Sequence, residues 1–126
     1  MAYMKLNGLR RPILIAAVAF AVLRGPAWAG AGVISAYPNP CEIAPGAHAC
    51  TTYVSWTTQG VAHARVYVRA EGRGATPDRE FGSGRACAKC GAKWIAAGAR
   101  YIFTLIDFST GARGPDLASV VVTAIK

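Results

Sequence analysis

The residues best suited to chemistry in this chain are two cysteines three positions apart, in Cys87-Ala88-Lys89-Cys90. A Cys-x-x-Cys pair can exchange thiol and disulfide, and Lys89 beside the sulfurs would favour a thiolate. Such exchangers place the first cysteine at the start of a helix, whereas glycines surround this motif and no helical pattern follows it. We therefore predict a disulfide that staples a loop. Thiol redox exchange or metal handling by Cys87 and Cys90 is the alternative function.

Few other residues in the sequence could bind a metal or take part in catalysis. A zinc site would need two more soft ligands, and His48 and His63 are the only histidines in the chain. Asp78 and Glu80 flank Arg79, a pattern typical of solvated ion pairs rather than acid–base catalysis. No Gly-x-Ser-x-Gly elbow, phosphate-binding loop or His-x-x-x-His pair occurs. The sequence predicts a protein that is not an enzyme and holds no metal or cofactor.

The other two cysteines, Cys41 and Cys50, flank a turn rich in proline, glycine and alanine at 42–49. A bridge between them would close a short loop between two expected strands, which stabilises by roughly 2–3 kcal/mol on the chain-closure model. We predict a Cys41–Cys50 disulfide. Disulfides require an oxidising compartment, so the next question is whether the chain is exported.

Residues 1–29 have the three-part layout of a secretory signal peptide. A stretch with three basic residues precedes an apolar run at 12–23, and the small-x-small triplet Ala27-Trp28-Ala29 follows. The apolar run is much shorter than the roughly 20 residues of a membrane-spanning helix. We predict cleavage after Ala29, a mature domain at 30–126, a secreted or periplasmic location and no stable membrane span. Cleavage after Ala31 and an uncleaved membrane anchor are the alternatives.

The formal net charge of +8 gives a misleading view of the mature domain. Four basic residues lie in the leader and all six acidic residues lie after it, so the remainder carries ten basic and six acidic residues. This modest excess does not indicate a nucleic-acid-binding protein. A hydrophobic content of 53% excludes a disordered chain.

Short β-rich runs separated by proline and glycine fill the mature domain, and none has a helical period. Trp56 and Tyr101 refine this pattern. Trp56 is large enough to fill the space between two sheets. Tyr101 stands where a tyrosine corner would place it, with its phenol bonded to the preceding connection. We predict a seven-stranded antiparallel β-sandwich, with a small barrel as the alternative. The expected strands are 33–36, 51–58, 64–69, a short one near 80–81, 94–95, 101–107 and 117–124.

Several of these residues together carry a resemblance to a known fold. Trp56, Val66-Tyr67-Val68 and Ile95 through Phe103 resemble the order of apolar positions in fibronectin type III and related immunoglobulin-like domains. Pro38-Asn39-Pro40-Cys41 and the run Cys50 to Trp56 are similar to the start of such modules in bacterial secreted and surface proteins. Phe103 stands where antibody domains have a cysteine, so the resemblance implies no disulfide between the sheets.

An exposed patch follows from alternation on two strands that are neighbours in such a sandwich. If Val66 and Val68 face the core, their neighbours face outward, and the same rule applies to 101–107. The predicted binding residues are Arg65, Tyr67, Arg69, Ile102, Thr104 and Ile106. We expect a non-catalytic interaction module whose partner is an extracellular or periplasmic protein or polysaccharide. An ordinary solvated face or a homodimer contact is the alternative. The span at 70–91 is expected to be mainly a mobile loop.

The leader yields the first prediction. The exported protein should begin at Gly30 or Gly32, because both sites follow a small-x-small triplet after the apolar run. N-terminal sequencing of the protein recovered from the medium or the periplasm measures this directly. Exported material that still begins at Met1 would contradict it.

Overall fold

The computed structural model describes residues 30–126. The signal peptide predicted at 1–29 lies outside the described residues. Within the described range there is no helix long and apolar enough to cross a membrane. The strands are β3 (Ala31–Tyr37), β4 (Cys41–Glu42), β5 (Cys50–Gln59), β6 (Ala64–Gly72), β7 (Thr76–Ser83), β8 (Ala86–Ile95), β9 (Ala99–Asp107), β10 (Asp116–Val122) and β11 (Ala124–Ile125).

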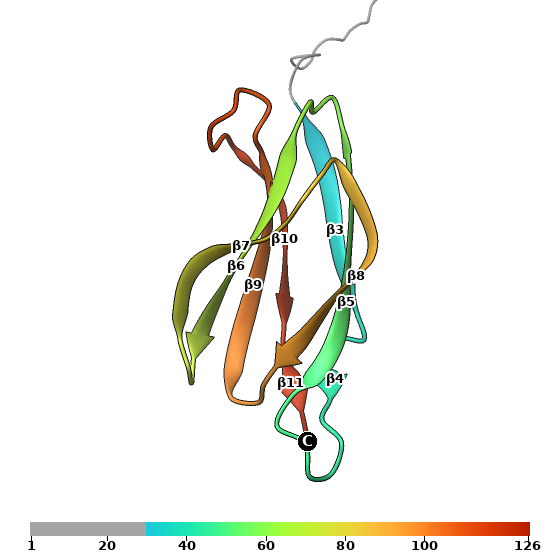
Figure 1. The fold of residues 1–126 in the computed structure, drawn as a ribbon, viewed down its shortest axis with the longest axis vertical. Helices are drawn as coiled ribbons and strands as arrows, with labels where there is room; N and C mark the ends of the chain where they lie inside the picture. The colour runs from blue at the N-terminus through green and yellow to red at the C-terminus, as the bar shows by residue number, and fades with distance from the viewer. Residues whose placement is uncertain (1–29) are drawn as a thin grey trace, which may run out of the picture.

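Two antiparallel sheets make up most of the domain (Figure 1). One has the order β3-β5-β8, and the other has the order β10-β9-β6-β7. A short parallel pair, β11 with β4, lies at the end near the C-terminus. The predicted all-β architecture of antiparallel sheets is confirmed, and the arrangement is consistent with a β-sandwich.

Alternation along β6 explains how one strand serves both the core and the surface. Its core-facing residues Val66 and Val68 are buried, whereas Arg65, Tyr67 and Arg69 lie on the outer side and are exposed or half-buried. Successive side chains of a strand point to opposite faces, so placing the valines inside forces their neighbours outside. This part of the sequence prediction is confirmed.

Aromatic side chains from both sheets meet in the core. Trp56 of β5 is 2% exposed, and its indole N–H donates a hydrogen bond to the carbonyl of Gly84 at 3.0 Å. The ring of Phe81 in β7 lies 6.3 Å from that of Trp56 and 5.1 Å from that of Phe103 in β9, edge to face in both cases. Trp94 of β8 lies 6.3 Å from Phe81. Edge-to-face pairs of this kind add to the stabilisation from burial alone.

The glycine-rich span at 70–91 is not the loop that the sequence suggested. It contains all of β7 and the first half of β8, so the prediction of at most one short strand was wrong. Most of β7 is exposed and carries no apolar alternation, and only Phe81 and Gly82 are half-buried. A Cβ at Gly82 would lie 3.0 Å from the Trp56 ring. The glycine therefore makes room for the tryptophan.

The tyrosine corner is confirmed. The phenol oxygen of Tyr101, near the start of β9, accepts the backbone N–H of Ala96 at 3.0 Å and donates to the carbonyl of Trp94 at 3.5 Å. These bonds tie the connection between β8 and β9 back to the strand. They also give hydrogen-bond partners to the hydroxyl of Tyr101, a residue that is only 8% exposed. A buried hydroxyl without a partner would destabilise the folded protein.

Phe81→Ala tests whether the glycine-rich span belongs to the core. Removing the ring should lower the free energy of unfolding by on the order of 3 kcal/mol, because it leaves a void between the two sheets. Urea denaturation of the domain at 30–126 measures the loss. Val33→Ala is the matched control, since Val33 is 66% exposed and should change stability by less than about 0.5 kcal/mol. Equal effects of the two substitutions would contradict the role of Phe81.

Candidate functional site

The patch predicted from alternation is only half exposed. Residues Arg65, Tyr67 and Arg69 of β6 pair in register with Ile106, Thr104 and Ile102 of β9, as the prediction required. The three residues of β9 are nevertheless buried. Ile106 is 0% exposed, and Thr104 and Ile102 are each 8% exposed. The prediction that they form part of an open surface was wrong.

Flat side chains from β6 and from the loop after β9 stack on one another at this face. The rings of Tyr67 and Phe108 are stacked, with centroids 6.0 Å apart. The guanidinium carbon of Arg65 lies 4.5 Å from the centre of the Phe108 ring, and that of Arg113 lies 5.1 Å from the centre of the Tyr67 ring. Because β9 lies between β6 and β10, neighbouring strands cover its outward residues on both sides.

The charges on this outer face are largely balanced within the protein. Arg65 contacts Glu80 at 3.4 Å, and Arg69 contacts Glu71 at 3.3 Å. Arg113 contacts Asp78 at 3.6 Å. Exposed ion pairs add little stability, but they leave fewer free charges to attract a partner. This face therefore offers a weaker recognition site than its composition indicated.

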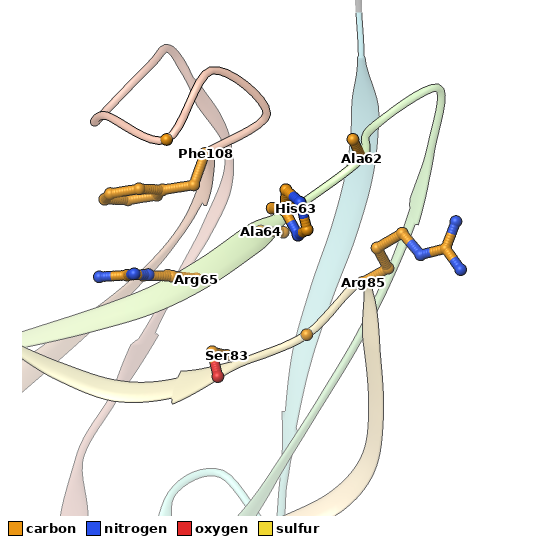
Figure 2. Close-up of a pocket in the computed structure, with 9 residues that line it drawn as sticks. Ala62, His63, Ala64, Arg65, Ser83, Arg85 and Phe108 are labelled. Carbon is orange, nitrogen blue, oxygen red and sulfur yellow. The ribbon is translucent and has the colours of Figure 1, made fainter.

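A hollow of about 630 Å³ lies at one end of this face, between the turn before β6 and the loop after β9. Figure 2 shows the Arg65 guanidinium beneath the Phe108 ring, and the Arg85 guanidinium pointing away from both. In a binding pocket a few polar groups usually point toward one position. Here the guanidinium groups of Arg65 and Arg85 point in different directions. Among residues 30–126 there is no group of three or more His, Cys, Asp or Glu side chains that could hold a metal ion.

The outer face of the three-stranded sheet carries exposed aromatic residues instead. Tyr37 of β3 and Tyr53 of β5 are register partners, 80% and 46% exposed. They line a hollow of about 560 Å³ together with serines and a lysine. We call this the tyrosine surface, and it consists of Ser35, Tyr37, Pro38, Tyr53, Ser55 and Lys89.

The Cys-x-x-Cys motif shapes the edge of the tyrosine surface. Cys87 and Cys90 form a disulfide, as predicted, and both pack against the core. Trp56 pairs with Cys87, and Val54 pairs with Cys90. Two residues of β8, Ala88 and Lys89, therefore lie opposite the single residue Ser55 of β5. This is a β-bulge, which re-aims the side chains of the bulged strand.

Lys89 lies at the outer side of that bulge. Its φ is 58°, the left-handed region that non-glycine residues seldom adopt. Its backbone N–H donates to the Ser55 hydroxyl at 2.9 Å. The disulfide and this hydrogen bond together hold Lys89 beside the two tyrosines. The second predicted disulfide, Cys41–Cys50, is also present and links β4 to β5.

The tyrosine surface was missed at the level of sequence, although one signal for it was visible. Tyr53 stands in the alternating run that puts Trp56 inside, so its outward direction could be deduced. Tyr37 ends its strand just before Pro38, and nothing in the sequence reveals that it pairs with Tyr53. Register between distant strands depends on the whole sheet.

Protein-family models, curated protein sequences and solved structures were compared with this chain, and no match was found.

Thiol counting tests the structural interpretation of the four cysteines. The non-reduced mature protein should take up no alkylating reagent in denaturant, because Cys41–Cys50 and Cys87–Cys90 are both bonded. Intact mass measurement gives the number of labelled thiols, and peptide mapping gives the pairing. Two labelled thiols at Cys87 and Cys90 would contradict the stapling role and favour thiol exchange. A bridge between the two pairs would contradict the connectivity.

Proposed function

We propose that this protein is an exported, non-catalytic binding module that recognises a polysaccharide through the tyrosine surface. The observation that carries this proposal is the exposure of Tyr37 and Tyr53 side by side on one face of a sheet. Large exposed apolar groups are unfavourable in water unless something covers them. Tyrosine combines a flat apolar ring with a hydroxyl, which suits the faces and hydroxyl groups of a sugar.

The strand order supports an immunoglobulin-like fold of the fibronectin type III kind. Seven main strands, β3 and β5 to β10, divide into a three-stranded and a four-stranded sheet. The tyrosine corner lies near the start of the sixth of them, as it does in immunoglobulin-like domains. Such folds host many functions, so the fold supports a binding role only weakly.

Export is supported by two independent features. The first is the leader at 1–29, with its basic stretch, apolar run and small-x-small triplet. The second is that all four cysteines are in disulfides, which persist in oxidising compartments. We infer a secreted or periplasmic location.

Thiol exchange by Cys87 and Cys90 is the less favoured function. The pair lies in a bulged strand and packs against the core, whereas exchangers expose the attacking sulfur at the start of a helix. The surface around Arg65, Tyr67 and Arg69 remains the second candidate for recognition. It is the natural comparison in any binding experiment, because Tyr67 lies on the opposite sheet from Tyr37 and Tyr53.

Retention on insoluble polysaccharides tests the proposed function. Wild-type protein, the Tyr37→Ala/Tyr53→Ala double variant and Tyr67→Ala should be incubated with a panel of purified cell-surface and extracellular polysaccharides. We expect at least one polymer to retain the wild type and Tyr67→Ala, and the double variant to lose about tenfold or more in affinity because aromatic anchors dominate recognition surfaces. Thermal unfolding confirms that each variant is folded.

Two outcomes would overturn this assignment. Loss of binding in Tyr67→Ala, with retention in the double variant, would move recognition to the β6 face. Failure of every polymer to retain the folded wild type would reject polysaccharide binding itself.

A further inference from the structure

We propose that the ligand of the tyrosine surface is an acidic polysaccharide, whose sugar rings pack on Tyr37 and Tyr53 and whose carboxylate pairs with Lys89. This inference rests on the proposed function and names its ligand class. Three features carry it, namely the separation of charge between the two sheets, the alignment of side chains across the sheet and the placement of Lys89.

Charge is separated between the two sheets. Strands β3, β5 and β8 contain no aspartate or glutamate, and the charged residues they carry are Lys89 and Lys93, both exposed. Five of the six acidic residues belong to strands of the other sheet, and these are Glu71, Asp78, Glu80, Asp107 and Asp116. Neither lysine takes part in an ion pair within the described residues. The three-stranded face is thus an uncompensated positive surface, which favours an anionic ligand.

Two rows of residues cross this face. In the first row Tyr37 pairs with Tyr53, and Tyr53 pairs with Gly91. A Cβ at Gly91 would lie 3.6 Å from the Tyr53 ring, an ordinary van der Waals distance, so the ring lies against β8 at this position. In the second row Ser35 pairs with Ser55, and Ser55 accepts the N–H of Lys89.

These rows place apolar rings beside hydroxyls and a cation. Three neighbouring strands span about 10 Å, which suits a short segment of a sugar chain lying across the sheet. An aromatic row can pack against the C–H faces of pyranose rings, while the serines and Lys89 meet hydroxyl and carboxylate groups. An acidic peptide would supply the charge but not the flat rings that match two adjacent tyrosines.

The disulfide explains why Lys89 is available to the ligand. A lysine in the left-handed region is unfavourable and persists where the surrounding structure enforces it. Here the Cys87–Cys90 bridge fixes both ends of the bulge, and Ser55 holds the N–H of Lys89. The backbone of Lys89 is thereby held at the edge of the tyrosine surface before binding, which reduces the entropy lost on association.

The experiment uses three probes on the mature protein: polygalacturonate, a neutral galactan and polyglutamate. Wild type should prefer polygalacturonate to both others, with affinity that falls as salt is added. Lys89→Gln should weaken polygalacturonate binding about tenfold, since a charge-assisted contact is lost, and Lys89→Arg should retain most of it. Tyr53→Ala should weaken it at least as much. Val33→Ala is the matched control, because Val33 is exposed on the same face but outside the tyrosine surface, and it should bind as wild type does.

The double variant Cys87→Ser/Cys90→Ser tests the placement of Lys89. It should unfold cooperatively yet bind polygalacturonate about as weakly as Lys89→Gln does, because the bulge loses its constraint. A folded double variant with wild-type affinity would overturn the positioning role of the disulfide. If the double variant does not fold, the comparison of Lys89→Gln with Lys89→Arg still tests whether the charge at position 89 binds the polymer, because both variants keep the disulfide.

The remaining outcomes separate this inference from the proposed function. Equal binding of the galactan by wild type and Lys89→Gln, with loss in Tyr53→Ala, would overturn the acidic ligand and leave polysaccharide recognition standing. Equal affinity for polyglutamate and polygalacturonate, insensitive to Tyr53→Ala, would indicate an acidic peptide and overturn both.

Discussion

Within residues 30–126 the two sheets share no ladder of backbone hydrogen bonds, so buried side chains hold them together, among them Trp56 in contact with Phe81 and Gly82. Trp56 belongs to the three-stranded sheet, and the other two residues belong to β7 of the four-stranded sheet. The indole N–H reaches the carbonyl of Gly84 in the turn that follows. The chain continues from this turn directly into β8, and β8 pairs with β5, the strand that carries Trp56. One buried ring therefore contributes both to the packing of the two sheets and to the path of the chain between them.

The packing inside decides what each sheet presents outside. On the four-stranded sheet, Ile102 and Ile106 of the inner strand β9 are buried, and the arginines of β6 beside them are balanced by nearby acids. On the three-stranded sheet, Tyr53 pairs with the exposed Tyr37 on one side and with Gly91 on the other, and it remains 46% exposed. The same alternation rule thus produces a closed face and an open one.

Sequence reasoning succeeded where the information is local. Alternation identified the buried faces at Trp56 and Val66, the short spacing of cysteine pairs indicated both disulfides, and the Gly98–Tyr101 region indicated the tyrosine corner. It failed where a residue's environment is supplied by distant segments. The exposure of Ile106 depends on the residues of flanking strands, and β7 shows no pattern because most of it faces solvent. The pairing of Tyr37 with Tyr53 is a matter of register, which the sequence of neither strand determines alone.

The Cys-x-x-Cys motif shows why a motif must be interpreted in its structural setting. A Cys-x-x-Cys pair suits redox chemistry when it lies at the start of a helix. Here the two cysteines lie on either side of a β-bulge in β8, which is an edge strand. The sulfurs face the core, and the residues between them are displaced outward. A small domain has few rigid positions to offer a ligand, and a side chain on an ordinary edge would lose rotamer freedom on binding. Closing the bulge with a covalent bond and a serine hydroxyl makes Lys89 part of the sheet surface. In the function proposed above, the cysteine pair acts through geometry, by fixing the backbone that carries Lys89, rather than through its own reactivity.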